Sequence, residues 1–154
     1  MADCIRNFDY ANPTRILFGK GQIAMLPQVI PKGTTIFMTY GGGSIKRNGV
    51  YDQVIKALEG YEIVEFGGIE ANPDFDTLMK AVRIIKTLDM SRVHLLSVGG
   101  GSVNDGTKFI AAACFTETEE DAWNIVYTHG CGITKALPIG CIMTLPAVRY
   151  MIVL

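Results

Sequence analysis

The residues best suited to chemistry are two copies of the motif GGGS, each directly after an apolar run. The first copy occupies residues 41–44 and the second occupies residues 99–102. Glycine lets backbone amides approach a phosphate, and a following helix turns its free N–H groups and partial positive charge toward the anion. Ser44 and Ser102 can each add a hydroxyl. We therefore predict two phosphate-binding loops, one near the adenosine and one near the pyrophosphate of a dinucleotide.

Each loop, taken alone, is explained equally well as a tight turn between a strand and a helix, since glycine is common in turns. Neither loop matches the GxGxxG fingerprint, and the chain has no GxxxxGK[ST] phosphate loop. The repetition at equivalent positions of two successive units favours dinucleotide binding over the simple turn.

Other polar residues give weaker indications. Asp105 lies one helical turn beyond the second loop, where it either faces the cofactor cleft or forms a surface ion pair with Lys108. His94 and His129 are in separate elements, so we assign no metal ligand and no catalytic residue. The four cysteines include no CxxC pair and are expected to be free thiols. They are Cys4, Cys114, Cys131 and Cys141.

Strands alternating with helices would position these loops. Continuous apolar runs predict strands at 34–40, 61–66 and 92–98, and helical spacing of apolar residues predicts helices at 45–58, 74–88 and 103–114. We also predict a short first strand at 14–19 closed by a GKG turn, a helix at 117–127 and a last strand at 135–145. The fold class is therefore α/β: a doubly wound, mostly parallel, Rossmann-like sheet with an N-terminal strand and turn.

Composition limits the range of functions. With 154 residues, 49% hydrophobic and 19% charged, the chain has the balance of one packed domain. A net charge of -1 gives no field for nucleic acid or for an anionic membrane, so neither is an expected partner. The first ten residues carry charges and no apolar run, which predicts a cytoplasmic location.

Five sequence segments, in this order along the chain, resemble the nucleotide-binding domain of the iron-containing (group III) alcohol dehydrogenases. The resemblance is strongest to the NADPH-dependent aldehyde reductase and butanol dehydrogenase branch of that family. The five segments are PTRILFGKG at 13–21, TYGGGSIKRNGVYDQV at 39–54, FGGIEANP at 66–73, VGGGSVNDGTKFIAAA at 98–113 and LPIGCIMTLPA at 137–147. The resemblance implies hydride transfer between primary alcohols and aldehydes, and a homodimer. It also implies a cofactor site made of Gly41, Gly42, Gly43, Ser44, Gly99, Gly100, Gly101, Ser102, Asp105 and Thr144.

The resemblance further implies that NADP is favoured over NAD. Relatives that prefer NAD carry an aspartate where this chain has Gly41, Gly42 and Gly43. An acid there would repel a 2′-phosphate, whereas glycines with Lys46 and Arg47 nearby leave room and positive charge for it.

Two departures from the family pattern limit this expectation. The chain reads TLPAVRYMIVL and ends where the pattern continues as TGSE, so we divide it into a dinucleotide-binding domain, 1–147, and a divergent tail, 148–154. The family's iron or zinc is held by an aspartate and three histidines of a later helical domain, and those positions do not exist here. We expect a truncated half that is inactive alone. A stand-alone nucleotide-binding or regulatory module and a non-functional truncated product are the alternatives.

Overall fold

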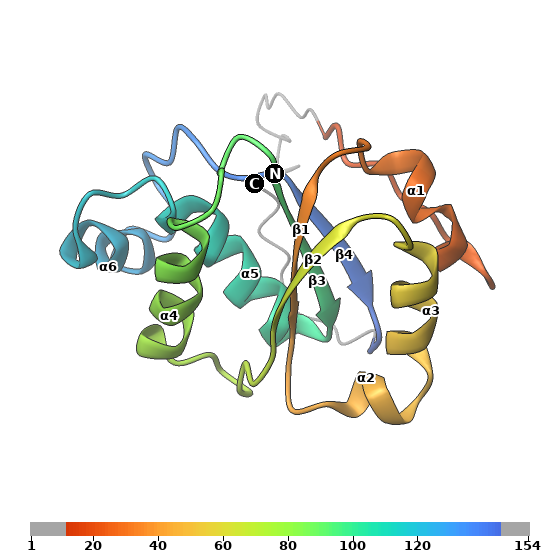
Figure 1. The fold of residues 1–154 in the computed structure, drawn as a ribbon. Coiled ribbons are helices and arrows are strands. Elements are labelled where there is room, and N and C mark those ends of the chain that lie inside the picture. The colour runs from red at the N-terminus through yellow and green to blue at the C-terminus, as the bar shows by residue number, and fades with distance from the viewer. Residues whose placement is uncertain (1–11, 146–154) are drawn as a thin grey trace, which may run out of the picture.

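The computed structural model describes residues 12–145, which form a four-stranded parallel sheet covered by helices on both faces (Figure 1). The strands are β1 (Thr35–Tyr40), β2 (Glu62–Phe66), β3 (Val93–Gly99) and β4 (Ile139–Met143), in the spatial order β2-β1-β3-β4. The helices are the short η1 (Gln22–Met25), α1 (Leu26–Val29) and α2 (Ser44–Arg47), and the longer α3 (Val50–Ala57), α4 (Phe75–Ile85), α5 (Gly101–Ala113) and α6 (Glu119–Tyr127). The predicted α/β fold with a parallel sheet is confirmed.

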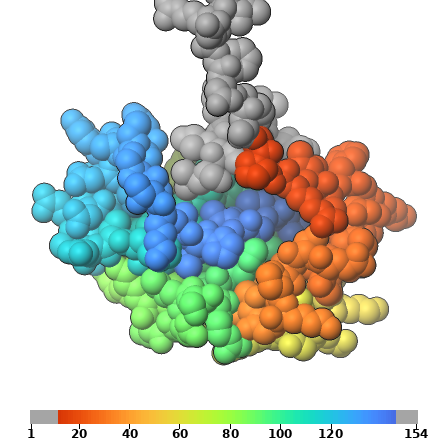
Figure 2. Space-filling view, turned by 90° about the horizontal axis from the view of Figure 1, so that it is seen from above, coloured from red at the N-terminus to blue at the C-terminus, as the bar shows by residue number. Residues whose placement is uncertain are grey.

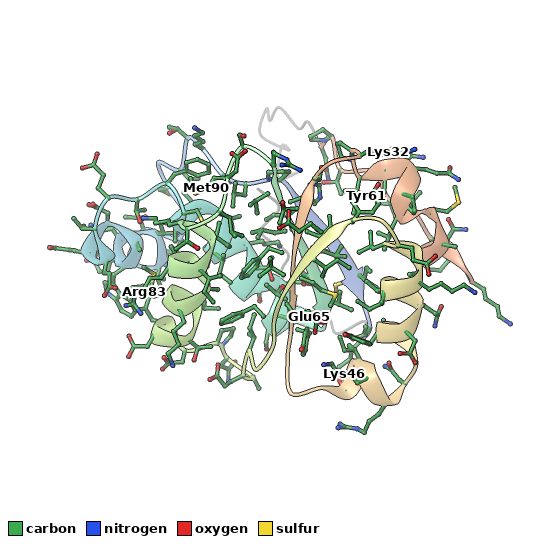
Figure 3. The ribbon with its side chains drawn as sticks, viewed as in Figure 1. Lys32, Lys46, Tyr61, Glu65, Arg83 and Met90 are labelled. Carbon is green, nitrogen blue, oxygen red and sulfur yellow. The ribbon has the colours of Figure 1, made fainter. Side chains whose placement is uncertain are left out.

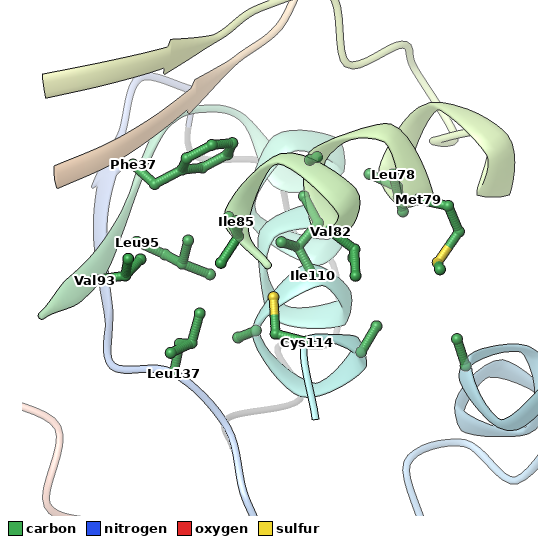
Figure 4. Close-up of a cluster of buried hydrophobic side chains, with 14 of the residues drawn as sticks. Phe37, Leu78, Met79, Val82, Ile85, Val93, Leu95, Ile110, Cys114 and Leu137 are labelled. Atoms are coloured by element: carbon green, nitrogen blue, oxygen red, sulfur yellow. The ribbon is translucent and has the colours of Figure 1, made fainter. Parts of the chain in front are cut away.

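The central strands are buried on both faces because helices cover both sides of the sheet, and successive side chains point to opposite sides. In β1, Ile36 and Met38 pack into a cluster with residues of α1 and α3, whereas Phe37 packs into a second cluster with α4 and α5 (Figure 4). In β3, Leu95 belongs to the α4 and α5 side and Leu96 to the α1 and α3 side. Continuous apolar runs therefore mark the two inner strands, as predicted.

Side-chain caps fix where two of the helices begin. Asp74 accepts hydrogen bonds from the backbone N–H groups of Asp76 and Thr77, which starts α4. Thr118 and Asp121 form a capping box that starts α6. The predicted helices at 74–88 and 117–127 are confirmed, although α4 ends at Ile85 and α6 begins at Glu119.

The predicted first strand at 14–19 is wrong. Residues 12–18 have no regular secondary structure, and the side chains of Ile16 and Phe18 are 80% and 95% exposed. The alternating pattern of this segment suits a strand, but no other described strand pairs with it. Figure 2 shows the amino-terminal end of the described chain on one side of the molecule, across from α6.

The predicted helix at 45–58 is two helices, α2 and α3. Asn48 and Gly49 separate them, and Gly49 has a φ of +75°, in the left-handed region that stops an α-helix. The predicted last strand at 135–145 is also too long, because Pro138 lacks an N–H group and β4 starts at Ile139. The proposed tail, 148–154, and Cys4 lie outside the described residues.

Candidate functional site

The two glycine loops meet at one end of the sheet. Tyr40 in β1 pairs with Val98 in β3, so the loops that follow these strands leave the sheet side by side. The chain passes from β1 to β2 on one side and from β3 to β4 on the other, which makes this position a topological switch point. Ligands of open α/β sheets bind beyond the carboxyl ends of the strands at such points.

The second loop is closely packed. A Cβ atom on Gly99 would lie 2.6 Å from Cγ2 and 2.8 Å from Cβ of Val103, so only glycine fits. The N–H of Thr144 donates to the carbonyl of Gly99 over 3.0 Å. The structure thus brings Thr144, at the end of β4, to the second loop.

Helix α5 begins within the second loop rather than at the predicted residue 103. Its first residue is Gly101, its N-cap is Gly100, and no side chain caps it. A helix of 13 residues has a full macrodipole, so its first N–H groups can bind an anion. Ser102 lies in this first turn, and its Oγ accepts a 3.4 Å hydrogen bond from the N–H of Asn72.

The first loop is open. Gly41 is confined, because a Cβ there would lie 3.1 Å from the carbonyl oxygen of Ile69. A Cβ on Gly42 or Gly43 would meet no atom within 4 Å, and Gly43 has a φ of +88°. The helix that follows, α2, has only 4 residues, so its dipole contributes little.

Buried polar side chains join the strands beneath these loops to α5. The hydroxyls of Thr39 and Thr107 lie 2.6 Å apart, and Thr107 donates to the carbonyl of Val103 over 2.7 Å. On β3, the Ser97 hydroxyl donates to the side-chain oxygen of Asn104. Because these buried groups are satisfied, they hold the start of α5 in a fixed position relative to both strands.

Asp105 and Lys108 do not form the ion pair considered from the sequence. Ion pairs in the part of the chain that the structure describes join Lys46 to Glu65 and Arg83 to Glu119. The Lys108 ammonium is buried without a hydrogen-bond partner, and Asp105 is exposed one turn beyond the second loop. The Asp105 carboxylate is thus available to a ligand.

The structure contains a charged cluster beside the first loop that the sequence did not predict. The carboxylate of Glu65, near the end of β2, accepts hydrogen bonds from the phenols of Tyr51 over 2.6 Å and Tyr40 over 3.0 Å. The ammonium of Lys46 lies 3.7 Å from the same carboxylate. The cluster joins β1, α2, α3 and β2, and Figure 3 shows Lys46 and Glu65 close together.

Glu65 remains ionised in this cluster. Partial burial alone would raise its pKa, but the hydrogen bonds from Tyr51 and Tyr40 and the charge of Lys46 outweigh burial, and the pKa is lowered. The hydrogen bond to Glu65 raises the pKa of Tyr51. One signal could have pointed to Glu65, because dinucleotide-binding folds place an acid at the end of the second strand, about 20 residues beyond the first loop.

The histidines and cysteines do not build a metal centre in residues 12–145. No group of three His, Cys, Asp or Glu side chains there is placed to hold a metal ion. Burial lowers the pKa of His94 and raises the pKa of the Cys114 thiol to about 12. Cys131 and Cys141 are also free thiols. None of the helices in this range is long and apolar enough to cross a membrane.

Residues 13–148 match the family described as iron-containing alcohol dehydrogenase. The chain belongs to this family. It is 52% identical over 143 residues to the NADPH-dependent aldehyde reductase YqhD of Escherichia coli, covering 93% of this chain and 36% of that protein. It is 45% identical over 146 residues to the probable NADH-dependent butanol dehydrogenase 1 of Bacillus subtilis, covering 93% and 36%. The chain therefore spans about a third of the length of these relatives.

Solved structures agree on the fold. The aldehyde reductase YqhD of Escherichia coli, in its substrate-free and cofactor-free form, superposes with a TM-score of 0.85 at 52% identity, covering 92% of this chain and 37% of that one. The NADH-dependent butanol dehydrogenase A of Thermotoga maritima gives a TM-score of 0.80 at 40% identity, covering 90% and 35%. The described domain is thus the Rossmann-like amino-terminal domain of the family.

Proposed function

We propose that this chain supplies the NADP-binding part of an alcohol dehydrogenase or aldehyde reductase that interconverts primary alcohols and aldehydes. Two GGGS motifs meet at adjacent strand ends, at the switch point of the sheet, which is where open α/β sheets bind their ligands. Membership of the family supports the proposal, as do the relatives, an NADPH-dependent aldehyde reductase and a probable NADH-dependent butanol dehydrogenase.

Within this proposal, residues 1–147 are the dinucleotide-binding domain and the two loops have different roles. The second loop takes the pyrophosphate at the uncapped start of α5, with Thr144 beside it and Asp105 one turn further. The first loop takes the adenosine side, where Gly42 and Gly43 border open space. The bound nicotinamide supplies or accepts the hydride. The residues proposed to hold the cofactor are Gly41, Gly42, Gly43, Ser44, Gly99, Gly100, Gly101, Ser102, Asp105 and Thr144.

The preference for NADP is also part of the proposal. It is supported by the absence of an acid in the first loop and by YqhD, which uses NADPH. Other relatives use NADH, so the family alone does not decide the preference. A cytoplasmic location and a homodimer remain predictions. The described residues hold no group of three His, Cys, Asp or Glu side chains that fits the iron of the family.

Calorimetric titration of the purified 154-residue chain with NADPH tests the proposal. We expect saturable binding, and we expect Ser102→Asp to weaken it at least about tenfold, because a carboxylate in the first turn of α5 repels a pyrophosphate. The same carboxylate favours the helix dipole, so the melting temperature should not fall. This separates loss of binding from loss of folding.

Gln28→Glu is the matched control, since it adds the same charge on the exposed side of α1. Binding by this variant should equal that of the parent chain. A parent chain that binds neither NADPH nor NADH would overturn the proposal, as would equal weakening by both substitutions.

A further inference from the structure

The Lys46 side chain lies beside the first loop but points away from the place expected for a 2′-phosphate. Lys46 is the cation nearest in sequence to the first loop, yet its ammonium is directed into the cluster with Glu65. It lies 4.6 Å from the ring centroid of Tyr51 and 5.0 Å from that of Tyr40. The Lys46 side chain is thus held by one negative charge and two aromatic faces.

The members of the cluster are held with unequal strength. Glu65 is fixed by two phenol hydrogen bonds, of 2.6 Å and 3.0 Å. Lys46 approaches the carboxylate only to 3.7 Å, and its side chain remains 48% exposed. Exposed ion pairs of this kind are weak, and a lysine stem has four rotatable bonds. Lys46 can therefore leave the cluster while Glu65 stays.

We propose that Glu65 sets the preference between NADPH and NADH by competing with the 2′-phosphate for Lys46. The inference rests on the proposed dinucleotide site. With Lys46 against Glu65, the pair carries no net charge and the first loop gains little attraction for a phosphate. When a 2′-phosphate occupies the open space beside Gly42 and Gly43, Lys46 turns from the carboxylate to the phosphate. Glu65 is then a specificity-determining residue that acts through Lys46, without touching the cofactor.

Glu65→Gln tests this inference, because glutamine has nearly the same shape but carries no charge. Its amide oxygen can accept one phenol hydrogen bond, and its amide N–H can donate to the other phenol oxygen. Titrations of the whole chain with NADPH and with NADH should show about fivefold tighter binding of NADPH and a change of less than about twofold for NADH, as one unit charge at short range predicts. Glu62→Gln is the matched control, at the opposite end of β2, where Glu62 accepts a hydrogen bond from Thr35. It should change neither affinity.

A second variant separates action through Lys46 from simple repulsion. Lys46→Met should weaken NADPH about tenfold and leave NADH unchanged. Glu65→Gln should then have no further effect in the Lys46→Met background. Equal effects of Glu65→Gln on both dinucleotides, or the same effect with and without Lys46, would overturn the inference while leaving the dinucleotide site standing. Absence of binding of either dinucleotide to the parent chain would overturn both. Thermal melts establish that each variant is folded.

Discussion

The two glycine loops share four identical residues but differ in structure. The second loop is enclosed: Gly99 packs on Val103, Thr144 bonds to its carbonyl, and a helix of 13 residues follows. The first loop is open at Gly42 and Gly43, precedes a helix of 4 residues and borders a cluster of ionisable side chains. The same motif thus forms a closely packed turn before a long helix in one unit and an open turn before a short helix in the other.

This difference teaches that the helix behind a glycine loop, and not the loop itself, decides how it can bind an anion. Where the helix is long, its backbone N–H groups and dipole can attract an anion without a charged side chain. Where the helix is a single turn, the charge has to come from side chains, and those side chains can be held by other partners. Selectivity is therefore expected at the first loop and anchoring at the second.

The largest expected effect is a difference in stability between two variants, each of which adds one methyl group to one of the loops. Gly99→Ala should lower the free energy of unfolding by about 2–3 kcal/mol, because the new Cβ overlaps the Cβ and Cγ2 atoms of Val103. The Cβ of Val103 is fixed to the backbone and cannot rotate away. Gly42→Ala should change it by less than about 0.5 kcal/mol, since nothing lies within 4 Å. Urea unfolding of both variants measures the contrast. Equal losses would mean that the two loops are equally packed.

The next effect concerns the hydroxyl pair under the loops. Thr107 donates to the carbonyl of Val103, so Thr39 donates to Thr107. Thr107→Val should cost about 1–2 kcal/mol because it leaves the fully buried Thr39 hydroxyl unpaired. The double variant Thr39→Val with Thr107→Val should regain most of this loss. Chemical denaturation of the two variants measures it, and no recovery in the double variant would contradict the assignment.

A carboxylate in the open loop should reverse its selectivity. Gly42→Asp should shift the ratio of NADPH to NADH affinity toward NADH by about tenfold, because the acid repels a 2′-phosphate and accepts a bond from a 2′-hydroxyl. The site has room, and Gly42 does not need a positive φ. Paired titrations with the two dinucleotides measure the ratio. Tighter binding of NADH than of NADPH by the unmodified chain would contradict the preference.

The smallest expected effect is on acid stability. The lowered pKa of Glu65 stabilises the fold above the ordinary carboxyl range, and this contribution is lost as the pH falls through the lowered pKa. Since the side chain is 34% exposed, the effect should stay below about 1 kcal/mol. Glu65→Gln should therefore lose less stability than the parent between pH 7 and about pH 3. Unfolding curves at both pH values test this, and parallel losses would exclude it.

Much of the fold could be predicted from local patterns. The runs at 34–40 and 92–98 carry consecutive apolar residues, Ile36 to Met38 and Leu95 to Leu96, which place apolar side chains on both faces of each strand. This pattern fits strands between two helical layers. The helix at 45–58 was predicted as one element because its apolar spacing continues through Asn48 and Gly49. The φ of +75° at Gly49 is a backbone property that periodicity does not record.

The candidate site was predicted only in part, for a similar reason. Each glycine loop is a continuous segment of the sequence, so its residues can be predicted before the structure is known. The cluster around Glu65 cannot be, because Tyr40, Lys46, Tyr51 and Glu65 come from four elements that only the folded sheet brings together. The strand predicted at 14–19 failed because strand formation needs a neighbour, and neighbours are set by tertiary structure.

The placement of β4 has a consequence for motion within the domain. β4 is bonded to β3 on one side, and no described strand lies on its other side. Amide hydrogens of outer strands are released by small local openings, whereas those of inner strands exchange only through larger ones. The amides of 139–144 should therefore exchange with deuterated solvent earlier than those of β1 and β3. Because the Thr144 amide holds the carbonyl of Gly99, its exchange rate reports how often the second loop loosens.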